Sequence, residues 1–273
     1  MSNLLIRGMS GLVYSLAILT ACFSGPMPQV ALACILAILA VLEWTRFGSQ
    51  RIHWLSKLLI MFAIFISIYT FSGLFEVDFL ITEICRGLLA FAIGGILITQ
   101  ALRDDATVKG LFQSCFALIY IGVPMILLPM MAHYQGENHP WMLASVFILI
   151  WCNDTFAYFF GSAIGRHKLF PRISPNKTWE GFVGGIVGTL AAAIIFHHYL
   201  PYMPLLGWLG LALVVLVFGT LGDLFESAIK RSYNIKDSGS FMPGHGGILD
   251  RIDSLLFALP MAYFYLRIFE NLH

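Results

Sequence analysis

Carboxylates and cations gather beside the ends of two apolar segments in the C-terminal half of this chain. Asp223 and Glu226 follow a Gly-rich apolar run, and Asp250 and Asp253 begin the last apolar run. If the helix of the first run continues, both of its carboxylates share one face with Ser227 and Lys230. Capping explains one acidic residue at a helix start, but not two together with a set of nearby cations. These cations are Lys230, Arg231, Lys236 and Arg251.

A Gly-rich loop around His245 separates the two clusters. Glycines at 244, 246 and 247 allow a positive φ angle and close approach to a ligand, and exposed N–H groups in such a loop can bind an anion. Mg²⁺ is usually held by one or two carboxylates plus substrate phosphates, while Lys and Arg bind the remaining phosphate charge. The residue types therefore predict a phosphoryl- or nucleotidyl-transfer site. The sequence has neither a Walker A nor a G-x-G-x-x-G pattern, so common soluble nucleotide-binding folds are not indicated.

A second polar segment, residues 164–180, carries candidates for a nucleotide pocket. Its end, residues 174–180, combines hydroxyls, an amide, an ammonium and an indole just before an apolar run. Asn176, Lys177 and Trp179 are the candidate ligands there, and Thr178 is a candidate N-cap of the following helix. The other basic residues of this segment have a simpler explanation, because cytoplasmic loops are rich in Lys and Arg and contact anionic headgroups.

The elements that position these residues are membrane-spanning helices. Apolar and aromatic residues make up 59% of the 273 residues and charged residues only 11%, with a mean hydropathy of +0.82, whereas soluble domains have about 25% charged residues. A span needs about 20 apolar residues. Nine segments qualify: 8–24, 27–45, 54–74, 79–99, 110–132, 140–163, 181–200, 203–223 and 252–270.

We therefore expect an all-α, polytopic integral membrane protein with about nine transmembrane helices in a single membrane domain, 1–273. An N-terminal helical part, 1–139, precedes a catalytic helical part, 140–273, with cytoplasmic loops at 164–180 and 224–251. An alternative for the first segment is a signal sequence cleaved before Cys22, within Leu19-Thr20-Ala21-Cys22. The five widely spaced cysteines indicate neither a zinc site nor a disulfide framework.

The basic residues determine the expected orientation. With the N-terminus inside, all of the 16 Lys and Arg residues except Arg86 and Arg267 lie on the cytoplasmic side, as the positive-inside rule requires. Both long polar segments then face the cytoplasm, and the C-terminus lies outside. The net charge of +1 gives no overall field that would favour nucleic acid, so no nucleic-acid partner is expected.

The polar motifs resemble those of a known family. Ser227-x-x-Lys230-Arg231 and Lys236-Asp237-Ser238-Gly239 precede Pro243-Gly244-His245-Gly246-Gly247-x-x-Asp250-Arg251-x-Asp253-Ser254. Together they resemble the signature of phosphatidate cytidylyltransferases, or CDP-diacylglycerol synthases. Asp154-x-x-Ala157-Tyr158 and the segment 174–181 are similar to that family too, and the resemblance covers about residues 150–260. Asn176 departs from it, since a Lys is more usual there, which weakens a phosphate-binding role at this position.

The resemblance implies a polytopic, homodimeric membrane enzyme, and with the orientation expected from the basic residues its active site faces the cytoplasm from the inner (plasma) membrane. It would join CTP and phosphatidic acid into CDP-diacylglycerol and pyrophosphate by metal-assisted in-line transfer, with one or two Mg²⁺ ions and room for an additional monovalent cation. By the same resemblance, Asp223 and Asp250 are the first metal ligands and Glu226 and Asp253 support them. It also implies phosphate contacts from Lys177, Lys230, Arg231, Lys236 and His245. Asn176, Trp179, Ser227 and Arg251 are implied ligands of the nucleotide or the other substrate, and Asp154 supports the site.

Two alternatives remain from the residues alone. A related CTP-dependent enzyme would use another lipid acceptor, such as an ether-lipid phosphate or a polyprenol. A transporter would use intramembrane carboxylates such as Asp154 and Asp223 as an ion pathway. Against transport, the sequence has no paired repeats, and its polar residues cluster on one side of the membrane instead of at its middle.

Overall fold

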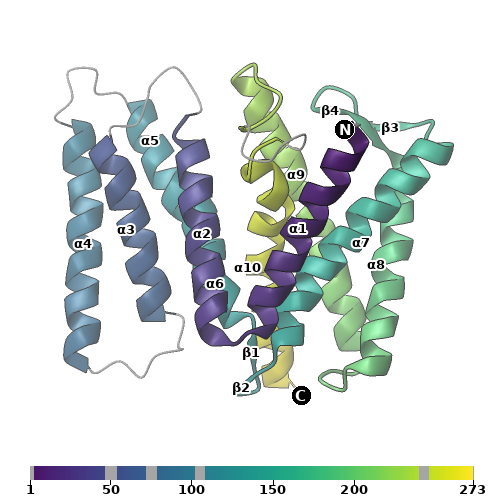
Figure 1. Cartoon of the computed structure of the whole chain (residues 1–273), viewed down its shortest axis with the longest axis horizontal. Coiled ribbons are helices and arrows are strands. Elements are labelled where there is room, and N and C mark those ends of the chain that lie inside the picture. Colours follow the sequence, from purple (N-terminus) through teal and green to yellow (C-terminus); the bar gives the residue numbers. More distant parts are fainter. Residues whose placement is uncertain (1–2, 47–53, 72–78, 102–107, 240–245, 273) are drawn as a thin grey trace. The chain divides into compact units, whose positions relative to one another are not determined.

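The computed structural model describes residues 3–46, 54–71, 79–101, 108–239 and 246–272, and helices dominate these residues (Figure 1). Within these described ranges the strands form two short antiparallel ribbons, one of β1 and β2 and one of β3 and β4. The helices are α1 (Asn3–Phe23), α2 (Pro26–Trp44), α3 (Trp54–Phe71), α4 (Phe79–Ala101), α5 (Val108–Ala117), a π-helical turn η1 (Leu118–Gly122), α6 (Val123–Met130), α7 (Pro140–Ile164), α8 (Trp179–Tyr199), α9 (Leu205–Ser232) and α10 (Leu249–Leu272). The strands are β1 (His133–Tyr134), β2 (Glu137–Asn138), β3 (Lys168–Phe170) and β4 (Ser174–Thr178).

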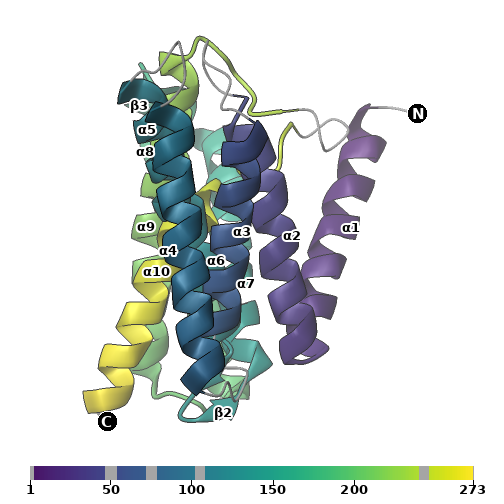
Figure 2. The same ribbon diagram turned by 90° about the vertical axis from the view of Figure 1, so that its left-hand side faces the viewer.

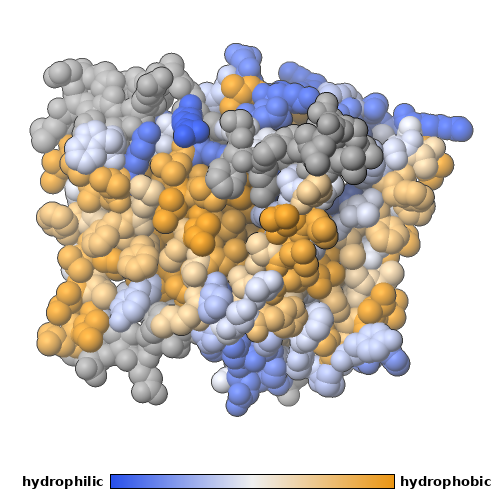
Figure 3. Space-filling view, in the orientation of Figure 1, coloured by the Kyte–Doolittle hydropathy of each residue, from blue (hydrophilic) through white to orange (hydrophobic). Residues whose placement is uncertain are grey.

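The predicted polytopic, all-α membrane fold is confirmed. Eight of the described helical segments are long and apolar enough to cross a bilayer, with α5, η1 and α6 forming the single segment Gly110–Met130. The apolar part of α1, Gly8–Phe23, is shorter. Each predicted span therefore coincides with a helical segment. Figure 3 shows hydrophobic residues along the sides of the helices and hydrophilic residues toward their ends, as a lipid-facing surface requires.

The predicted start of the loop 224–251 is wrong, because residues 224–232 belong to a helix. Helix α9 continues to Ser232, so Glu226, Ser227, Lys230 and Arg231 are helical. A buried ion pair between Glu226 and Lys230, one turn apart, stabilises this extension, and the polar residues that suggested a loop lie on helix faces instead. The segment 164–180 is likewise more ordered than a loop, because β3 and β4 form a hairpin in which Lys168 pairs with Thr178.

The chain divides into two compact units. The first comprises Met1–Met131 and Asp237–Arg251, and the second comprises Ala132–Lys236 and Ile252–His273. The predicted parts 1–139 and 140–273 are a division by role, and that division stays a prediction.

Polar side chains inside the first unit pair with one another. The Trp44 indole donates to the Gln113 carbonyl over 3.0 Å, and the Gln113 amide donates back to the Trp44 carbonyl over 3.2 Å. The Gln100 amide reaches the hydroxyls of Ser56 and Ser114 at 3.2 Å each. Such pairing is required of polar groups in an apolar environment, and it fixes the register of these helices. Figure 2 shows α1 and α2 as an antiparallel pair within this unit.

Glycines bring the helices of the second unit close together. On α8, Gly181, Gly184, Gly185 and Gly188 are all buried on the face that contacts α7. A Cβ at Gly184 would lie 2.6 Å from the Phe160 ring, so only glycine allows this approach. Gly222 of α9 has the same role against α10, since a Cβ there would lie 2.5 Å from the Asp253 carbonyl oxygen. This close packing sets the positions of the polar residues that follow or precede these glycines.

Candidate active site

A polar cavity of about 500 Å³ lies within the second unit. Residues from α7, the β3–β4 hairpin, α8 and α9 line it, so elements that follow one another along the chain meet there. Its charged and amide-bearing side chains are Asn153, Asp154, Asn176, Lys177 and Asp223, joined by the hydroxyls of Tyr158, Ser162, Thr178 and Thr220. Four residues predicted from the sequence to serve one site, Asp154, Asn176, Lys177 and Asp223, are therefore brought together.

An ion pair between Lys177 and Asp223 lies at the wall of this cavity. The Lys177 ammonium is 2.5 Å from the Asp223 carboxylate oxygen Oδ2, and the two side chains are 26% and 31% exposed. The Ser227 hydroxyl, one turn further along α9, donates to the other oxygen of Asp223 over 3.3 Å. Both charged groups thus remain accessible from the cavity to a ligand.

The β3–β4 hairpin positions Lys177. Thr178, the residue after it, accepts a hydrogen bond from the Gly181 N–H over 3.1 Å, which confirms the predicted N-cap of α8. Glu180 accepts hydrogen bonds from the backbone N–H groups of Arg166 and His167, and its carboxylate lies 2.6 Å from the His167 ring. These contacts fasten both ends of the hairpin to the start of α8.

A second ion pair lies deeper in the same unit. The Lys230 ammonium is 2.5 Å from Glu226, and their side chains are only 11% and 1% exposed. Asp253 of α10 interacts electrostatically with the carboxylates of Asp223, Glu226 and Asp154. Four carboxylates of this unit therefore influence one another, and their oxygen atoms are of the hard kind that a divalent cation prefers.

The loop before α10 belongs to the first unit and is organised around Asp250. One oxygen of Asp250 accepts hydrogen bonds from the N–H groups of Ser238 (2.9 Å) and Gly247 (2.8 Å) and from the Ser238 hydroxyl (3.0 Å). Gly246 has φ near +90°, and a Cβ there would lie 2.6 Å from the same oxygen. The Gly-rich sequence is needed here because the backbone wraps a carboxylate.

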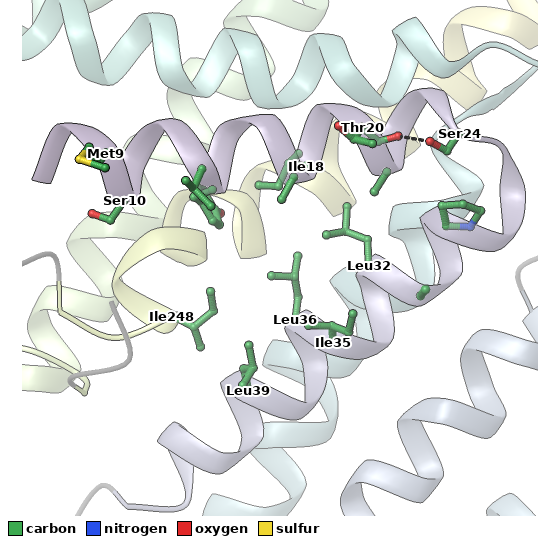
Figure 4. A pocket seen from close by; sticks show the side chains of 16 residues that line it. Met9, Ser10, Ile18, Thr20, Ser24, Leu32, Ile35, Leu36, Leu39 and Ile248 are labelled. Carbon is green, nitrogen blue, oxygen red and sulfur yellow. Dashed lines mark hydrogen bonds between the residues drawn. The ribbon is translucent and has the colours of Figure 1, made fainter. Parts of the chain in front are cut away.

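A larger cavity, of about 1030 Å³, also lies in the first unit, between α1 and α2 (Figure 4). Its lining runs from Met9 to Leu39 and includes Ile248. The polar side chains among its lining residues are the hydroxyls of Ser10, Tyr14, Thr20 and Ser24, with no carboxylate, ammonium, guanidinium or imidazole group. This cavity suits apolar chains, whereas the cavity of the second unit is lined by charged and amide-bearing side chains.

The sequence profile of the cytidylyltransferase family matches residues 5–269 of the chain. The chain belongs to the cytidylyltransferase family. Among curated relatives, the phosphatidate cytidylyltransferase of Bacillus subtilis is 37% identical over 97% of this chain and 98% of its own length. That of Haemophilus influenzae is 34% identical over 95% and 97%, respectively. The Staphylococcus saprophyticus protein of the same name is 50% identical over 53% of this chain. The family resemblance proposed from the polar motifs is therefore confirmed.

The other predicted site residues of this cytidylyltransferase-family chain have varied surroundings. Asn176 is exposed and lines the polar cavity, whereas Trp179 lines a separate apolar cavity of about 340 Å³ and is 53% exposed. Arg231, Lys236 and Arg251 are exposed. Asp250 and Arg251 belong to the first unit and the Asp223 cluster to the second, so their predicted shared site stays a prediction. His245 lies outside the described residues.

Sequence reasoning missed several residues of interest in this member of the cytidylyltransferase family. Asn153 and Thr220 line the polar cavity, but their residue types are common in transmembrane helices and gave no signal. Glu43 is buried in α2 and accepts hydrogen bonds from the loop before α10. The position of this acidic residue inside an apolar segment was the signal by which the sequence could have identified Glu43.

Proposed function

We propose that this chain transfers a cytidylyl group from CTP to phosphatidic acid, giving CDP-diacylglycerol and pyrophosphate. Two relatives named phosphatidate cytidylyltransferase match nearly the whole chain, which supports this activity. The single structural observation that carries the proposal is the polar cavity in which Lys177 and Asp223 meet. It combines a cation for phosphate with a carboxylate for a metal ion, inside a membrane protein whose substrate is a lipid.

In this reaction the phosphate oxygen of phosphatidic acid attacks the α-phosphorus of CTP. A new P–O bond forms as the bond between the α-phosphorus and its bridging oxygen breaks, and the electron pair leaves with pyrophosphate. A phosphate monoester is already a competent nucleophile at neutral pH, so no strong general base is required. The work of the protein is to bring two anions together in line and to stabilise the charge that develops on the leaving group.

Lys177 is the best-placed cation for this task. Its ammonium group is accessible at the cavity wall, and the hairpin and the Thr178 cap hold its backbone. We assign Lys177 to a phosphate of CTP, with Asn176 beside it in the same cavity. Lys230 is paired with Glu226 and almost buried, so its contribution is to set the charge of the cluster rather than to contact phosphate directly. We further assign phosphate contacts to Arg231, Lys236, His245 and Arg251 on the family resemblance.

The carboxylate cluster fits Mg²⁺. No group of three His, Cys, Asp or Glu side chains in the described part of the chain forms a metal site by itself. Mg²⁺ does not require such a group, because substrate phosphates complete its coordination when one or two carboxylates are present. We propose Asp223 as a ligand, with Glu226, Asp253 and, from the first unit, Asp250 as further candidates. When bound, Mg²⁺ supplies positive charge to the phosphates of CTP.

We also propose the cellular setting. The chain is a multi-pass membrane protein, and the distribution of Lys and Arg supports a cytoplasmic N-terminus in the inner (plasma) membrane. CTP then enters the site from the cytoplasm, while the diacyl tails stay in lipid. A homodimer is proposed from the family resemblance, and the mass of the purified complex, measured by light scattering with the detergent contribution subtracted, tests it.

The decisive experiment measures pyrophosphate release by the purified protein in detergent. CTP, phosphatidic acid and Mg²⁺ are supplied together and with each one omitted, and Asp223→Asn is compared with Glu137→Gln, which changes an exposed carboxylate of β2. We expect release only with all three components, loss of release in Asp223→Asn, and normal release in Glu137→Gln. Release with an ether-lipid phosphate or a polyprenyl phosphate, but not with phosphatidic acid, would assign another lipid acceptor. A folded protein that releases no pyrophosphate with any of them would contradict the proposal and favour an ion pathway.

A further inference from the structure

Glu43 occupies a position where a carboxylate is unfavourable unless something compensates for it. Glu43 is only 4% exposed, and it lies in the last turn of the apolar helix α2. Burying a charge is costly without hydrogen-bonded partners, and the negative end of the helix dipole repels an acidic group at this end. The compensation for Glu43 must therefore come from another part of the fold.

That compensation comes from the start of α10. One oxygen of Glu43 accepts the N–H of Ile248 over 2.8 Å, and the other accepts the N–H of Leu249 over 2.9 Å. Leu249 is the first residue of α10, and the first N–H groups of a helix have no partner within the helix. A carboxylate at this end also interacts favourably with the helix dipole. Glu43 thus caps α10 from a helix some 200 residues earlier in the chain.

The loop before α10 is also built around the Glu43 carboxylate. The Ser238 hydroxyl lies 3.0 Å from Glu43 and 3.0 Å from Asp250, so it connects the two carboxylates. A Cβ at Gly239 would lie 2.7 Å from the Glu43 carboxylate, and one at Gly247 would also collide with it. The two described ends of the loop, near residues 238 and 247, therefore both depend on one side chain of α2.

We propose that Glu43 is a positioning residue for cytidylyl transfer. By holding Ser238, Ile248 and Leu249, it fixes the first turn of α10, which carries Asp250 and Arg251. This inference rests on the proposed function and on the role proposed there for Asp250. Glu43 acts through the loop and touches no substrate itself, so its loss should reduce turnover more than substrate binding.

The test compares Glu43→Gln with the parent protein by hydrogen exchange and by steady-state kinetics. A Gln amide presents its NH₂ group to a backbone N–H in either orientation, so one of the two capping contacts becomes a contact between two donors. We expect at least one of the amides of Ile248 and Leu249 to exchange at least about tenfold faster, because it loses its acceptor. We expect kcat to fall by about 100-fold, as for a small misplacement of a catalytic group, with KM for phosphatidic acid changed by less than about threefold.

Gln29→Leu is the matched control. Gln29 is buried in the same helix, but its amide donates to the Cys22 carbonyl over 2.8 Å and has no contact with the loop in the hydrogen bonds described. This variant should leave the exchange of Ile248 and Leu249 and the value of kcat unchanged. The conservative variant Glu43→Asp keeps the charge and should recover part of kcat. If Glu43→Gln does not fold, Glu43→Asp, whose shorter side chain draws the carboxylate away from Ile248 and Leu249, takes its place with the same two measurements.

The inference is wrong if Glu43→Gln exchanges these amides like the parent protein, or if exchange accelerates while kcat is unchanged. Equal losses of kcat in Gln29→Leu would also overturn it, because a general loss of stability would then explain the effect. Absence of cytidylyl transfer in the parent protein would instead overturn the proposed function. The exchange data would in that case still decide whether Glu43 holds the loop.

Discussion

Lys177 and Asp223 form an ion pair that contributes little to stability. Their side chains are about a quarter to a third exposed, and pairs at the protein surface stabilise a fold by only about 0–1 kcal/mol. The pair between Glu226 and Lys230 is different, because both side chains are almost fully buried and each charge depends on the other. Two ion pairs of the same unit therefore differ in exposure, since one lies at the polar cavity and the other is enclosed by the protein.

We predict that Lys177→Met reduces kcat/KM for CTP by about 100- to 1000-fold, the usual effect of removing one group that stabilises transition-state charge. The melting temperature should change little, because this partly exposed pair contributes little stability. Steady-state kinetics and thermal unfolding of the same detergent-solubilised sample measure both quantities. A large fall in melting temperature with normal activity of the folded fraction would contradict this assignment.

For the buried pair we predict that Glu226→Gln and Lys230→Met each destabilise the protein by about 3–5 kcal/mol, since each leaves an unpaired buried charge. The double variant should lose less than the sum of the two single variants, because no unpaired charge remains. Thermal unfolding of all four proteins completes this double-mutant cycle. Additive losses would show that the two charges do not depend on each other.

At the scale of elements, glycine spacing determines where the polar residues lie. Gly222 allows α9 to approach the backbone of α10 directly beside Asp223, and the glycines of α8 do the same against α7. Gly219, one turn earlier on α9, has more room, since a Cβ there would meet its nearest neighbour, the Ser254 Cβ, at 3.7 Å. Close packing against α10 therefore requires glycine at position 222, whereas position 219 has room for a Cβ.

We predict that Gly222→Ala destabilises the protein by about 1–3 kcal/mol, as overpacking does, and lowers activity because Asp223 moves with the helix. Gly219→Ala should be neutral or stabilising by up to about 1 kcal/mol, because alanine favours a helix more than glycine. Thermal unfolding and pyrophosphate release of both variants provide the comparison. Equal behaviour of the two variants would rule out close packing at Gly222 as the reason for the glycine.

At the scale of the whole molecule, the distribution of charge predicts how the chain crosses the membrane. In the second unit, the β1–β2 ribbon and the β3–β4 hairpin lie at opposite ends of the helices (Figure 1), with the 25-residue helix α7 running between them. Lys and Arg are concentrated in the segments expected on the cytoplasmic side. The predicted orientation therefore places Lys177 on that side and Glu137 outside.

We predict that a membrane-impermeant maleimide labels Glu137→Cys in intact cells and Lys236→Cys only in inside-out membrane vesicles. Each cysteine is introduced into a chain whose five native cysteines are replaced by alanine, and thermal unfolding of the purified variants confirms that they fold. The reverse labelling pattern would invert the orientation and move the polar cavity away from cytoplasmic CTP.

Local features of the sequence were enough to predict the helices and part of the site. Apolar runs predicted nine spans, because a backbone in lipid must satisfy its own hydrogen bonds, and eight of the described helical segments are long and apolar enough to cross a bilayer. Helical spacing placed Glu226 and Lys230 on one face, and Thr178 was recognised as a cap from its position before an apolar run. Each of these inferences depends only on residues within a few positions of one another.

Contacts between distant segments depended on the tertiary structure. Nothing near Lys177 in the sequence indicates that its partner is Asp223, and nothing near Glu43 indicates Ser238 or Leu249. The end of α9 was misjudged for the same reason, since polar residues suggest a loop until their partners are known. Residue types reveal what chemistry a side chain can perform, whereas packing of the helices decides which side chains meet.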